Sequence, residues 1–252
     1  MRLKLLSGLL ITMQLVFAQD WLQAPNKLDS TGNKIGLWSV QVKNSIEVGR
    51  YILGKKEGTF KTYHAHAATT HLKSIVEYKE GVKDGIELEI NEKGMIAKEF
   101  HFKAGRKHGR QTEFHSFGRP SIIENWFLGQ RQGKMEKFSS QGKRLETGNF
   151  KAGKKHGKFQ WFYENGQVSA TYFYKSDKLE GIQTSYYKDG RKTTLATYLN
   201  GELEGDWLNF HENGRIKWKG QYSAGKKDGV WQSYDEAGRE RKREKYKNGE
   251  KK

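Results

Sequence analysis

Apolar and polar residues alternate in short stretches of this chain, and the alternation recurs at intervals of 24 residues. Ile216, Trp218 and Tyr222 occupy alternate positions with lysine and glutamine between them, which is the pattern of a half-buried strand. Just before it, Leu208 and Phe210 alternate with their neighbours and predict a second strand of about five residues. Each period therefore predicts one β-hairpin.

Glycine marks the period at three places. The first two sets have no gap: Gly85, Gly109, Gly133, Gly157, Gly181, Gly205 and Gly229, and then Gly94, Gly118, Gly142, Gly166, Gly190, Gly214 and Gly238. The third set has Asp177 in place of one glycine: Gly81, Gly105, Gly129, Gly153, Gly201, Gly225 and Gly249. A fixed period of this size indicates a repeat architecture in which each unit packs on its neighbours.

Turn residues separate the predicted strands. The segment His211–Gly214 ends in Asn-Gly, a strong hairpin signal because both residues tolerate positive φ. The segment Gly225–Gly229 is expected to be the loop that starts the next unit. The predicted fold is all-β, an elongated single-layer array of antiparallel β-hairpins with about nine repeats over residues 36–252. Two strands for each unit give about 10 Å of array for each repeat.

Two sets of aromatic residues follow the period, and we expect both to form ladders along one face of the sheet. A ladder of this kind holds a thin sheet together, and it also offers a surface for binding. One set stands five residues after the first glycine of each unit: Phe114, Phe138, Phe162, Tyr186, Phe210 and Tyr234. The other stands three residues before the third glycine position: Tyr78, Phe102, Trp126, Phe150, Tyr174, Tyr198, Tyr222 and Tyr246.

Residues 1–18 have the pattern of a secretory signal. Arg2 and Lys4 precede an apolar run, and Val16 and Ala18 supply small residues before a cleavage point. The alternative is a membrane anchor that is never cut, although the run is short for a transmembrane span. We therefore expect an exported protein, periplasmic or secreted, with a lead-in segment at residues 19–35 and no nucleic-acid partner.

The glycines and aromatics together resemble the MORN repeat, particularly its bacterial variant. The pattern Gly-x-aromatic-x-x-Gly-x-x-x-Gly-x-aromatic occurs at Gly49–Phe60, Gly148–Phe159 and Gly220–Trp231, and a looser form covers most of residues 36–252. The resemblance implies a hairpin array that serves as a non-catalytic scaffold for protein binding or self-association, with phospholipid contact proposed for some members. The 24-residue period is slightly long for this family.

Composition excludes several kinds of chemistry. The chain has no cysteine, so it has neither a disulfide framework nor a thiolate metal site. It has no phosphate-binding loop motif and no nucleophile elbow, and acidic residues such as Glu87, Glu89 and Glu136 lie beside basic ones on predicted strands. We therefore expect neither catalysis nor a cofactor.

Histidines gather at one place, His64, His66 and His71. A spacing of two on a strand places His64 and His66 on one face, as a metal site needs, and His71 returns across a turn. The surrounding alanines and threonines fit an ordinary surface loop equally well. We predict no metal site, and this histidine cluster is the alternative that stays open.

Basic residues recur with the period and give the chain a formal charge of +17. We expect them in the loops between units, where rows about 10 Å apart would reinforce one another toward a polyanion. Lysine and arginine on loops also serve solubility alone, so both readings stay open. The candidate anion-binding pairs are Lys55 and Lys56, Arg106 and Lys107, Lys154 and Lys155, and Lys226 and Lys227.

These patterns favour an exported, non-enzymatic repeat scaffold that binds another protein or a second copy of itself. An edge strand near Tyr246 would be an unpaired template for such contact. The alternative function is binding of anionic membrane lipid or envelope polysaccharide through the basic edges. An enzyme acting through strand carboxylates has no motif to support it.

Overall fold

The structure is a computed structural model that describes residues 24–66 and 69–252, without the side chains of residues 65–70. Within these ranges all regular structure is β-strand, and no helix could span a membrane. The predicted signal at residues 1–18 lies outside the described residues. The chain divides into two compact units, residues 1–118 and 119–252, which are described separately.

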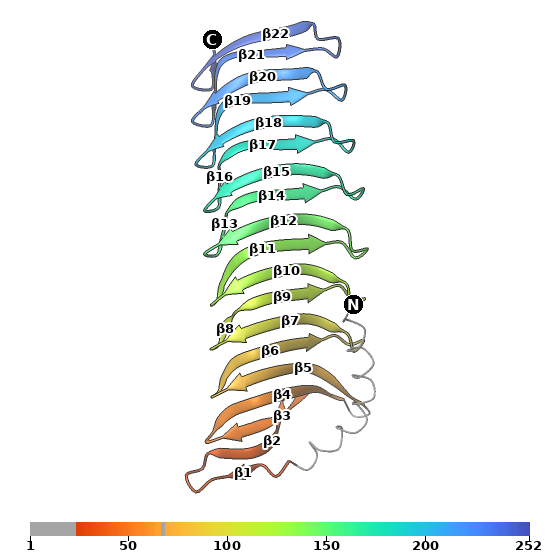
Figure 1. Ribbon diagram of the computed structural model, residues 1–252, viewed down its shortest axis with the longest axis vertical. Coiled ribbons are helices and arrows are strands. Elements are labelled where there is room, and N and C mark those ends of the chain that lie inside the picture. The colour runs from red at the N-terminus through yellow and green to blue at the C-terminus, as the bar shows by residue number, and fades with distance from the viewer. Residues whose placement is uncertain (1–23, 67–68) are drawn as a thin grey trace. The chain divides into compact units, whose positions relative to one another are not determined.

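The first unit is a single layer of antiparallel strands in which neighbours in the chain are neighbours in the sheet (Figure 1). The first strand lies inside the expected lead-in segment and pairs with the second. The strands are β1 (Lys27–Leu28), β2 (Lys34–Val42), β3 (Ser45–Ile52), β4 (Lys55–His66), β5 (Thr69–Lys79), β6 (Val82–Ile90), β7 (Ile96–Lys103), β8 (Arg106–Lys107) and β9 (Gly109–Phe114).

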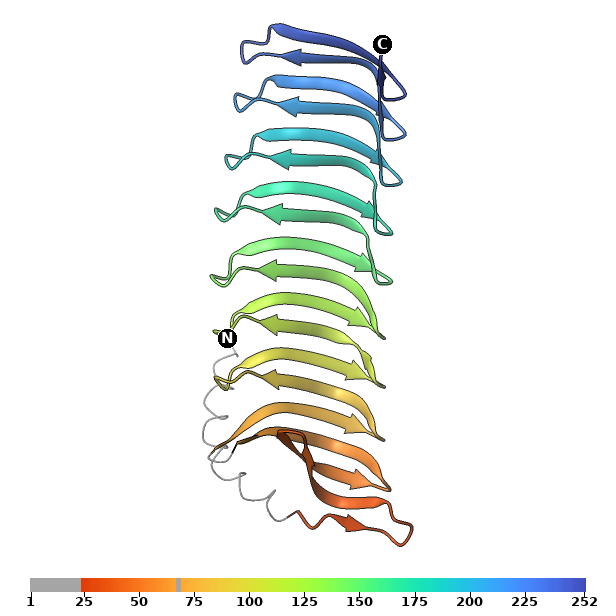
Figure 2. The same cartoon turned by 180° about the vertical axis from the view of Figure 1, so that it is seen from behind.

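The second unit has the same construction, and the predicted array of antiparallel hairpins is confirmed (Figures 1 and 2). Its strands are β10 (Pro120–Phe127), β11 (Gln130–Phe138), β12 (Arg144–Lys151), β13 (Lys154–Lys155), β14 (Gly157–Phe162), β15 (Val168–Lys175), β16 (Lys178–Leu179), β17 (Gly181–Tyr186), β18 (Lys192–Leu199), β19 (Glu202–Phe210), β20 (Ile216–Ser223), β21 (Lys226–Tyr234), β22 (Glu240–Lys247) and β23 (Glu250–Lys251).

The tightest turns lie at the third glycine position, not at Asn-Gly. Ala224 and Gly225 both have positive φ, 48° and 74°, and they join Ser223 directly to Lys226. Two consecutive positive-φ residues define the type I′ hairpin turn. At the Asn-Gly segment only Gly214 has positive φ, in a four-residue turn closed by a hydrogen bond from its N–H to the His211 carbonyl. The hairpin predicted at Asn213-Gly214 is confirmed, although only Gly214 takes a positive φ there.

Asp177 shows how the repeat tolerates the loss of one turn glycine. Its φ is 71°, so it takes the left-handed conformation that glycine has elsewhere. Its N–H donates to the Lys155 carbonyl at 3.0 Å, and its carboxylate accepts from the Lys155 N–H at 2.7 Å. In neighbouring repeats an acidic side chain such as Glu204 accepts from the turn backbone N–H, here that of Ala224. The carboxylate thus stabilises the turn from a different position.

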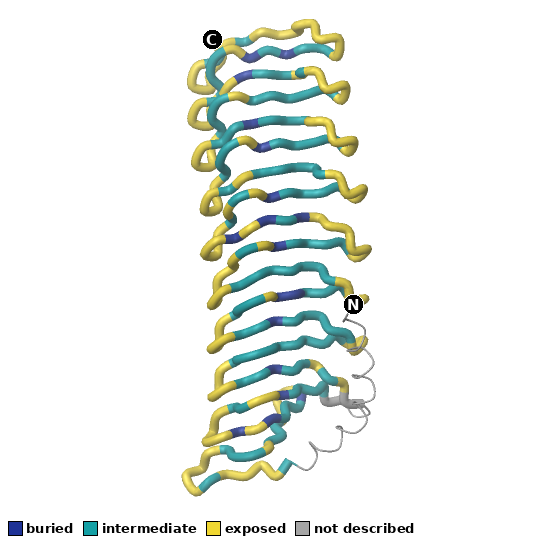
Figure 3. The backbone as a smooth tube through the Cα atoms, viewed as in Figure 1, coloured by how far each residue is buried: buried dark blue, intermediate teal, exposed yellow. Residues whose placement is uncertain are grey.

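Large rings form ladders on one face of each unit, which we call the ladder face. In the second unit Phe159 is fully buried and packs edge-on against Phe150 and Tyr174, with ring centroids 5.7 and 5.1 Å apart. Trp231 is 2 % exposed and lies between Tyr222 and Tyr246. Figure 3 shows the buried residues along the strands and the exposed ones in the turns. Edge-to-face ring pairs of this kind stabilise a sheet that has no second layer.

Glycines on the ladder face make room for these rings. Phe159 lies directly over Gly148, and Trp231 lies over Gly220, so that a Cβ at either glycine would overlap the ring. Gly49 and Phe60 repeat the arrangement in the first unit. This close approach explains why the first glycine of the motif stands eleven positions before an aromatic residue.

In two repeats glutamine takes the place of the ring. Gln183 accepts a hydrogen bond from the Phe173 N–H at 2.7 Å and donates to the Phe173 carbonyl at 3.3 Å. Gln111 makes the same two contacts with His101 in the first unit. The residue eleven positions earlier is then large, Tyr172 or Phe100 instead of glycine. A large side chain at one position is therefore matched by a compact one at the other.

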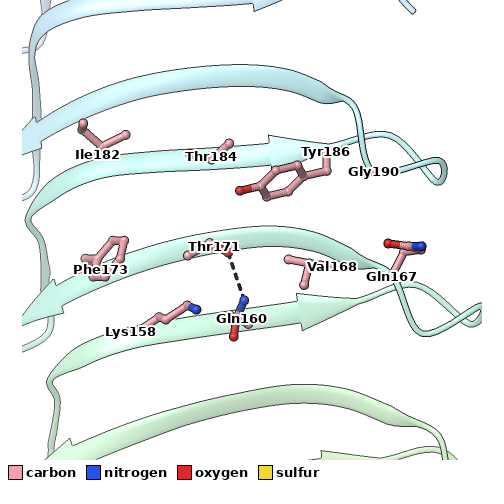
Figure 4. Close-up of a pocket in the computed structure, with 10 residues that line it drawn as sticks. All are labelled: Lys158, Gln160, Gln167, Val168, Thr171, Phe173, Ile182, Thr184, Tyr186 and Gly190. Atoms are coloured by element: carbon pink, nitrogen blue, oxygen red, sulfur yellow. Dashed lines mark hydrogen bonds between the residues drawn. The ribbon is translucent and has the colours of Figure 1, made fainter.

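The second aromatic set does not share this face. Tyr186 lies on the opposite side of the sheet with Ile182 and Thr184, and all three line the pocket drawn in Figure 4. Phe162 and Tyr234 contact Arg144 and Lys219, not the ladder rings. The expectation of two ladders on one face was wrong because strand alternation separates the two sets: Gly181 is the cross-strand partner of the ladder residue Tyr198, and Tyr186 stands an odd number of positions after Gly181.

Side chains also connect successive four-residue turns. The Tyr163 hydroxyl donates to the Tyr186 carbonyl at 2.6 Å, and the Tyr187 hydroxyl donates to the Phe210 carbonyl at 2.9 Å. Asn165 donates to the Lys188 carbonyl at 2.9 Å. Each turn thus holds the next one in place.

Candidate binding surfaces

The candidate basic residues lie at the beginnings of strands. Lys55 and Lys56 begin β4, Lys154 and Lys155 form β13, and Lys226 and Lys227 begin β21. The turn between strands consists only of the two residues before them, as in Ala224 and Gly225. The expectation that they lie in loops was wrong, because the type I′ turn is shorter than the five-residue loop expected from the sequence.

The second residue of each pair belongs to the ladder face. The Lys155 ammonium lies 5.0 Å from the ring centroids of both Phe159 and Tyr174. The Lys227 ammonium lies 4.2 Å from the Trp231 ring. In the first unit Lys56 covers Phe60 and Tyr78, and Lys107 covers Phe100 at 3.9 Å. These cations stabilise rings through cation–π contact and shield them from water.

The first residue of each pair is exposed to solvent. This holds for Lys55, Arg106, Lys154 and Lys226. Only one cation of each pair therefore remains fully available to solvent. The prediction that they bind an anionic partner stays a prediction.

The opposite face of the second unit carries a shallow groove, which we call the Phe173–Ile182 groove. It crosses β14, β15 and β17 (Figure 4). Phe173 is 40 % exposed and Ile182 is 53 % exposed, and the Gln160 amide donates to the Thr171 hydroxyl at 3.3 Å. Its lining residues are Lys158, Gln160, Gln167, Val168, Thr171, Phe173, Ile182, Thr184, Tyr186 and Gly190.

The two exposed apolar positions of the groove vary among the repeats. Repeat positions equivalent to Ile182 hold Ile86, Arg110, Lys134, Lys158, Asp206 and Val230. Those equivalent to Phe173 hold Asn125, Asn149, Thr197, Gln221 and Lys245. The fold therefore accepts charged and polar side chains at these outward positions, and the apolar pair is individual to this part of the chain.

Lysines surround the groove on the same face. Lys158 lines it, Lys175 is two positions beyond Phe173, and Lys178 is the cross-strand partner of Lys175. Lys192 is the cross-strand partner of Tyr186. All four are exposed, and in the described part of the chain none makes a salt bridge. The carboxylate of Glu180 on β17 instead accepts from the Asn200 N–H at 2.9 Å.

The strand carboxylates considered for catalysis are engaged in ion pairs. Glu87 pairs with Lys83 at 2.6 Å, Glu89 pairs with Lys98 at 2.8 Å, and Glu136 pairs with Lys134 at 2.8 Å. The Glu89 pair is exposed, whereas the Glu87 and Glu136 carboxylates are largely covered, with 14 % and 16 % of the side chain exposed. That these carboxylates take no part in catalysis stays a prediction.

Of the three clustered histidines, His64 and His71 are cross-strand partners on β4 and β5. The side chain of His66 lies outside the described residues. Among the side chains that are described, no group of three or more histidine and carboxylate residues could hold a metal ion.

The edge near Tyr246 is not the open template that the sequence suggested. Tyr246 pairs with Lys251 on β23, and the Lys252 N–H donates to the Lys245 carbonyl at 2.8 Å. The remaining outer residues of β22 are the charged run Glu240–Glu244. Charged side chains on an edge strand oppose pairing with another strand.

Residues 155–176 match the family described as MORN repeat variant. This match is consistent with a MORN-repeat protein. The matched segment runs from the ladder lysine Lys155 to the type I′ turn at Ser176, so it covers most of one 24-residue period of the array. A search among curated proteins found no match.

Sequence reasoning missed the Phe173–Ile182 groove, although the signal was present. An alignment of the periods shows apolar residues at two positions that are mostly polar in other repeats. Which face those positions occupy becomes clear only from the strand register.

Proposed function

We propose that this MORN array is an exported scaffold that binds another protein on the face opposite the ladder, without catalysing a reaction. The observation that carries the proposal is the difference in packing and exposure between the two faces of the sheet. Ladder-face side chains such as Phe159 and Trp231 are buried among their neighbours, whereas Ile182 and its equivalents Lys158 and Asp206 are exposed and differ in charge. Surface positions that a framework leaves free are those that a binding protein adapts to its partner.

Cross-linking in the source cells tests the scaffold role. The full-length chain carries a C-terminal affinity tag, and a lysine-reactive cross-linker is applied to intact cells before purification. We expect a discrete protein cross-linked to lysines of the groove side, such as Lys158 or Lys192. Repeated recovery of the uncross-linked chain alone would contradict the proposal.

Export is tested by the N-terminus of the mature protein. Amino-terminal sequencing of the chain from the periplasmic or culture fraction should begin at Gln19, after Ala18. A chain that begins at Met1 and stays in the cytoplasm would contradict export, and this result leaves the scaffold role to be judged by the cross-linking.

A second function, binding of anionic lipid or polysaccharide, is supported by the exposed cations that each unit carries, Lys55 and Arg106 in the first and Lys154 and Lys226 in the second. Co-sedimentation with vesicles containing anionic lipid, or with an acidic polysaccharide, should weaken as salt is raised. Reversal of Arg106 and Lys154 to glutamate should abolish it. Retention that survives both changes would exclude this function.

A further inference from the structure

We infer that the Phe173–Ile182 groove docks an acidic polypeptide segment, which places a bulky apolar side chain between Phe173 and Ile182 and carboxylates beside the surrounding lysines. The inference rests on the proposed scaffold function and names the chemistry of its partner. It combines three observations: an apolar pair that the fold does not need, a hollow between the two side chains, and four cations without acidic partners.

The apolar pair is not part of the framework. Phe173 and Ile182 are about half exposed, on the face away from the ladder rings. Asn149 and Lys158 fill the same repeat positions one period earlier, and Thr197 and Asp206 fill them one period later. Exposed apolar side chains that a repeat can do without mark a site of interaction.

The charges around the groove select the partner. Lys158, Lys175, Lys178 and Lys192 bring four positive charges to one face, and Lys175 and Lys178 are direct cross-strand neighbours. Like charges directly opposite destabilise a sheet unless something compensates them. Carboxylates of a bound segment would supply that compensation, and rim charges of opposite sign raise association rates and specificity.

A second copy of this chain fits the groove less well. With a formal charge of +17, two copies repel each other, and each would bring its own four lysines to the contact. An acidic partner removes this repulsion, so the charge distribution favours a different protein.

Selection from a displayed library of random linear peptides tests the inference directly. The purified chain is the bait, and the double variant Phe173→Asn with Ile182→Asp is the counter-selection bait. Both replacements are residues that the same repeat positions hold elsewhere, Asn149 and Asp206, so we expect the variant to fold. Circular dichroism and the urea midpoint verify this before selection.

We expect the selected peptides to combine Asp or Glu with a large apolar residue. The double variant should bind a synthetic selected peptide at least about tenfold more weakly, a change of 1.4 kcal/mol. The control variant Val230→Asp changes the equivalent exposed position two periods after Ile182 and should leave the affinity unchanged.

The lysines are tested with the same peptide. Lys175→Gln with Lys178→Gln should weaken binding and reduce its dependence on salt. Lys103→Gln with Arg106→Gln removes the same charges three periods earlier and should have little effect.

The outcomes separate the two proposals. Basic or uncharged consensus peptides, peptides insensitive to the double variant, or a selection that yields none would overturn the docking inference. A protein cross-linked in cells whose binding ignores the double variant would leave the scaffold function standing while the groove is excluded. Cross-links only between copies of this chain would reject the acidic partner in favour of self-association.

Discussion

The two faces of the second unit carry similar side chains that have opposite surroundings. On the ladder face Phe159 is fully buried, flanked by rings and covered by Lys155. On the other face Phe173 is 40 % exposed in a groove with lysines around it. A single-layer sheet must stabilise itself from one face, and this leaves the other face available for contact with another molecule.

The same contrast holds for lysine. Lys155 is in contact with two rings, and positions equivalent to it hold Leu179 and Leu203, so its alkyl chain matters as much as its charge. Lys158, three residues later, lines the groove on the other face. Among the described residues, its ammonium makes no cation–π contact. A count of charges along the sequence gives both lysines the same weight, although Lys155 contacts two aromatic rings and Lys158 is exposed to solvent.

The largest difference between the faces should appear on removal of the two phenylalanine rings. Phe159→Ala should lower the free energy of unfolding by about 3–5 kcal/mol, because it leaves a cavity among packed rings. Phe173→Ala removes an exposed ring and should cost less than about 1 kcal/mol. Urea denaturation of both variants measures this, and equal losses would contradict the division between the faces.

The size match on the ladder face can be broken and restored. Gly148→Tyr alone should destabilise the chain by about 1–3 kcal/mol because the new side chain meets Phe159. When it is combined with Phe159→Gln, the pair copies Tyr172 and Gln183, so the double variant should be more stable than the sum of the single changes indicates. Urea unfolding of the four proteins gives the coupling energy, and simple additivity would reject the match.

Alkaline pH should weaken the ladder face. Burial raises the pKa of Tyr174 and of Tyr222 above 10.0, so their folded forms hold the proton more tightly than the unfolded chain. This stabilisation is fully present below pH 10 and is lost as pH rises through the raised pKa. Tyrosinate absorbance and urea unfolding at increasing pH measure the loss.

Tyr174→Phe is the matched control for the alkaline effect. Phe150 fills the equivalent position one period earlier, so the variant should fold, and part of the pH dependence should disappear. An unchanged pH profile would show that this tyrosine does not contribute.

The smallest expected effect concerns the ladder lysines. Lys155→Leu should change the free energy of unfolding by less than about 1 kcal/mol, because leucine holds the same position at Leu179 and Leu203. Lys155→Asp places a carboxylate over the electron-rich faces of Phe159 and Tyr174 and should cost more. Thermal unfolding compares the two, and equal stability would reject the cation–π contact.

Much of the fold could be predicted from the sequence because the 24-residue glycine spacing restricts the strand order. The ladder through Tyr222 and Tyr246 was also predictable from alternation. The type I′ turn could not be predicted, because nothing in the sequence shows that Ala224 takes a positive φ. Lys226 and Lys227 were therefore expected in a loop, whereas they begin a strand. The face of Tyr186 follows from alternation as well, but only once the register shows that Gly181 pairs with the ladder residue Tyr198.

Pairs matched in size, such as Gly148 and Phe159, restrict where a repeat can be duplicated or deleted. Gly148 and Phe159 lie on either side of the type I′ turn at Ala152 and Gly153, whereas the four-residue turn at Tyr163–Gly166 lies outside the pair. A duplication or deletion with its breakpoint in a four-residue turn would carry both partners together. One with its breakpoint in a type I′ turn would separate a ring from its glycine. A segment that is duplicated or deleted in this array should therefore begin and end in a four-residue turn.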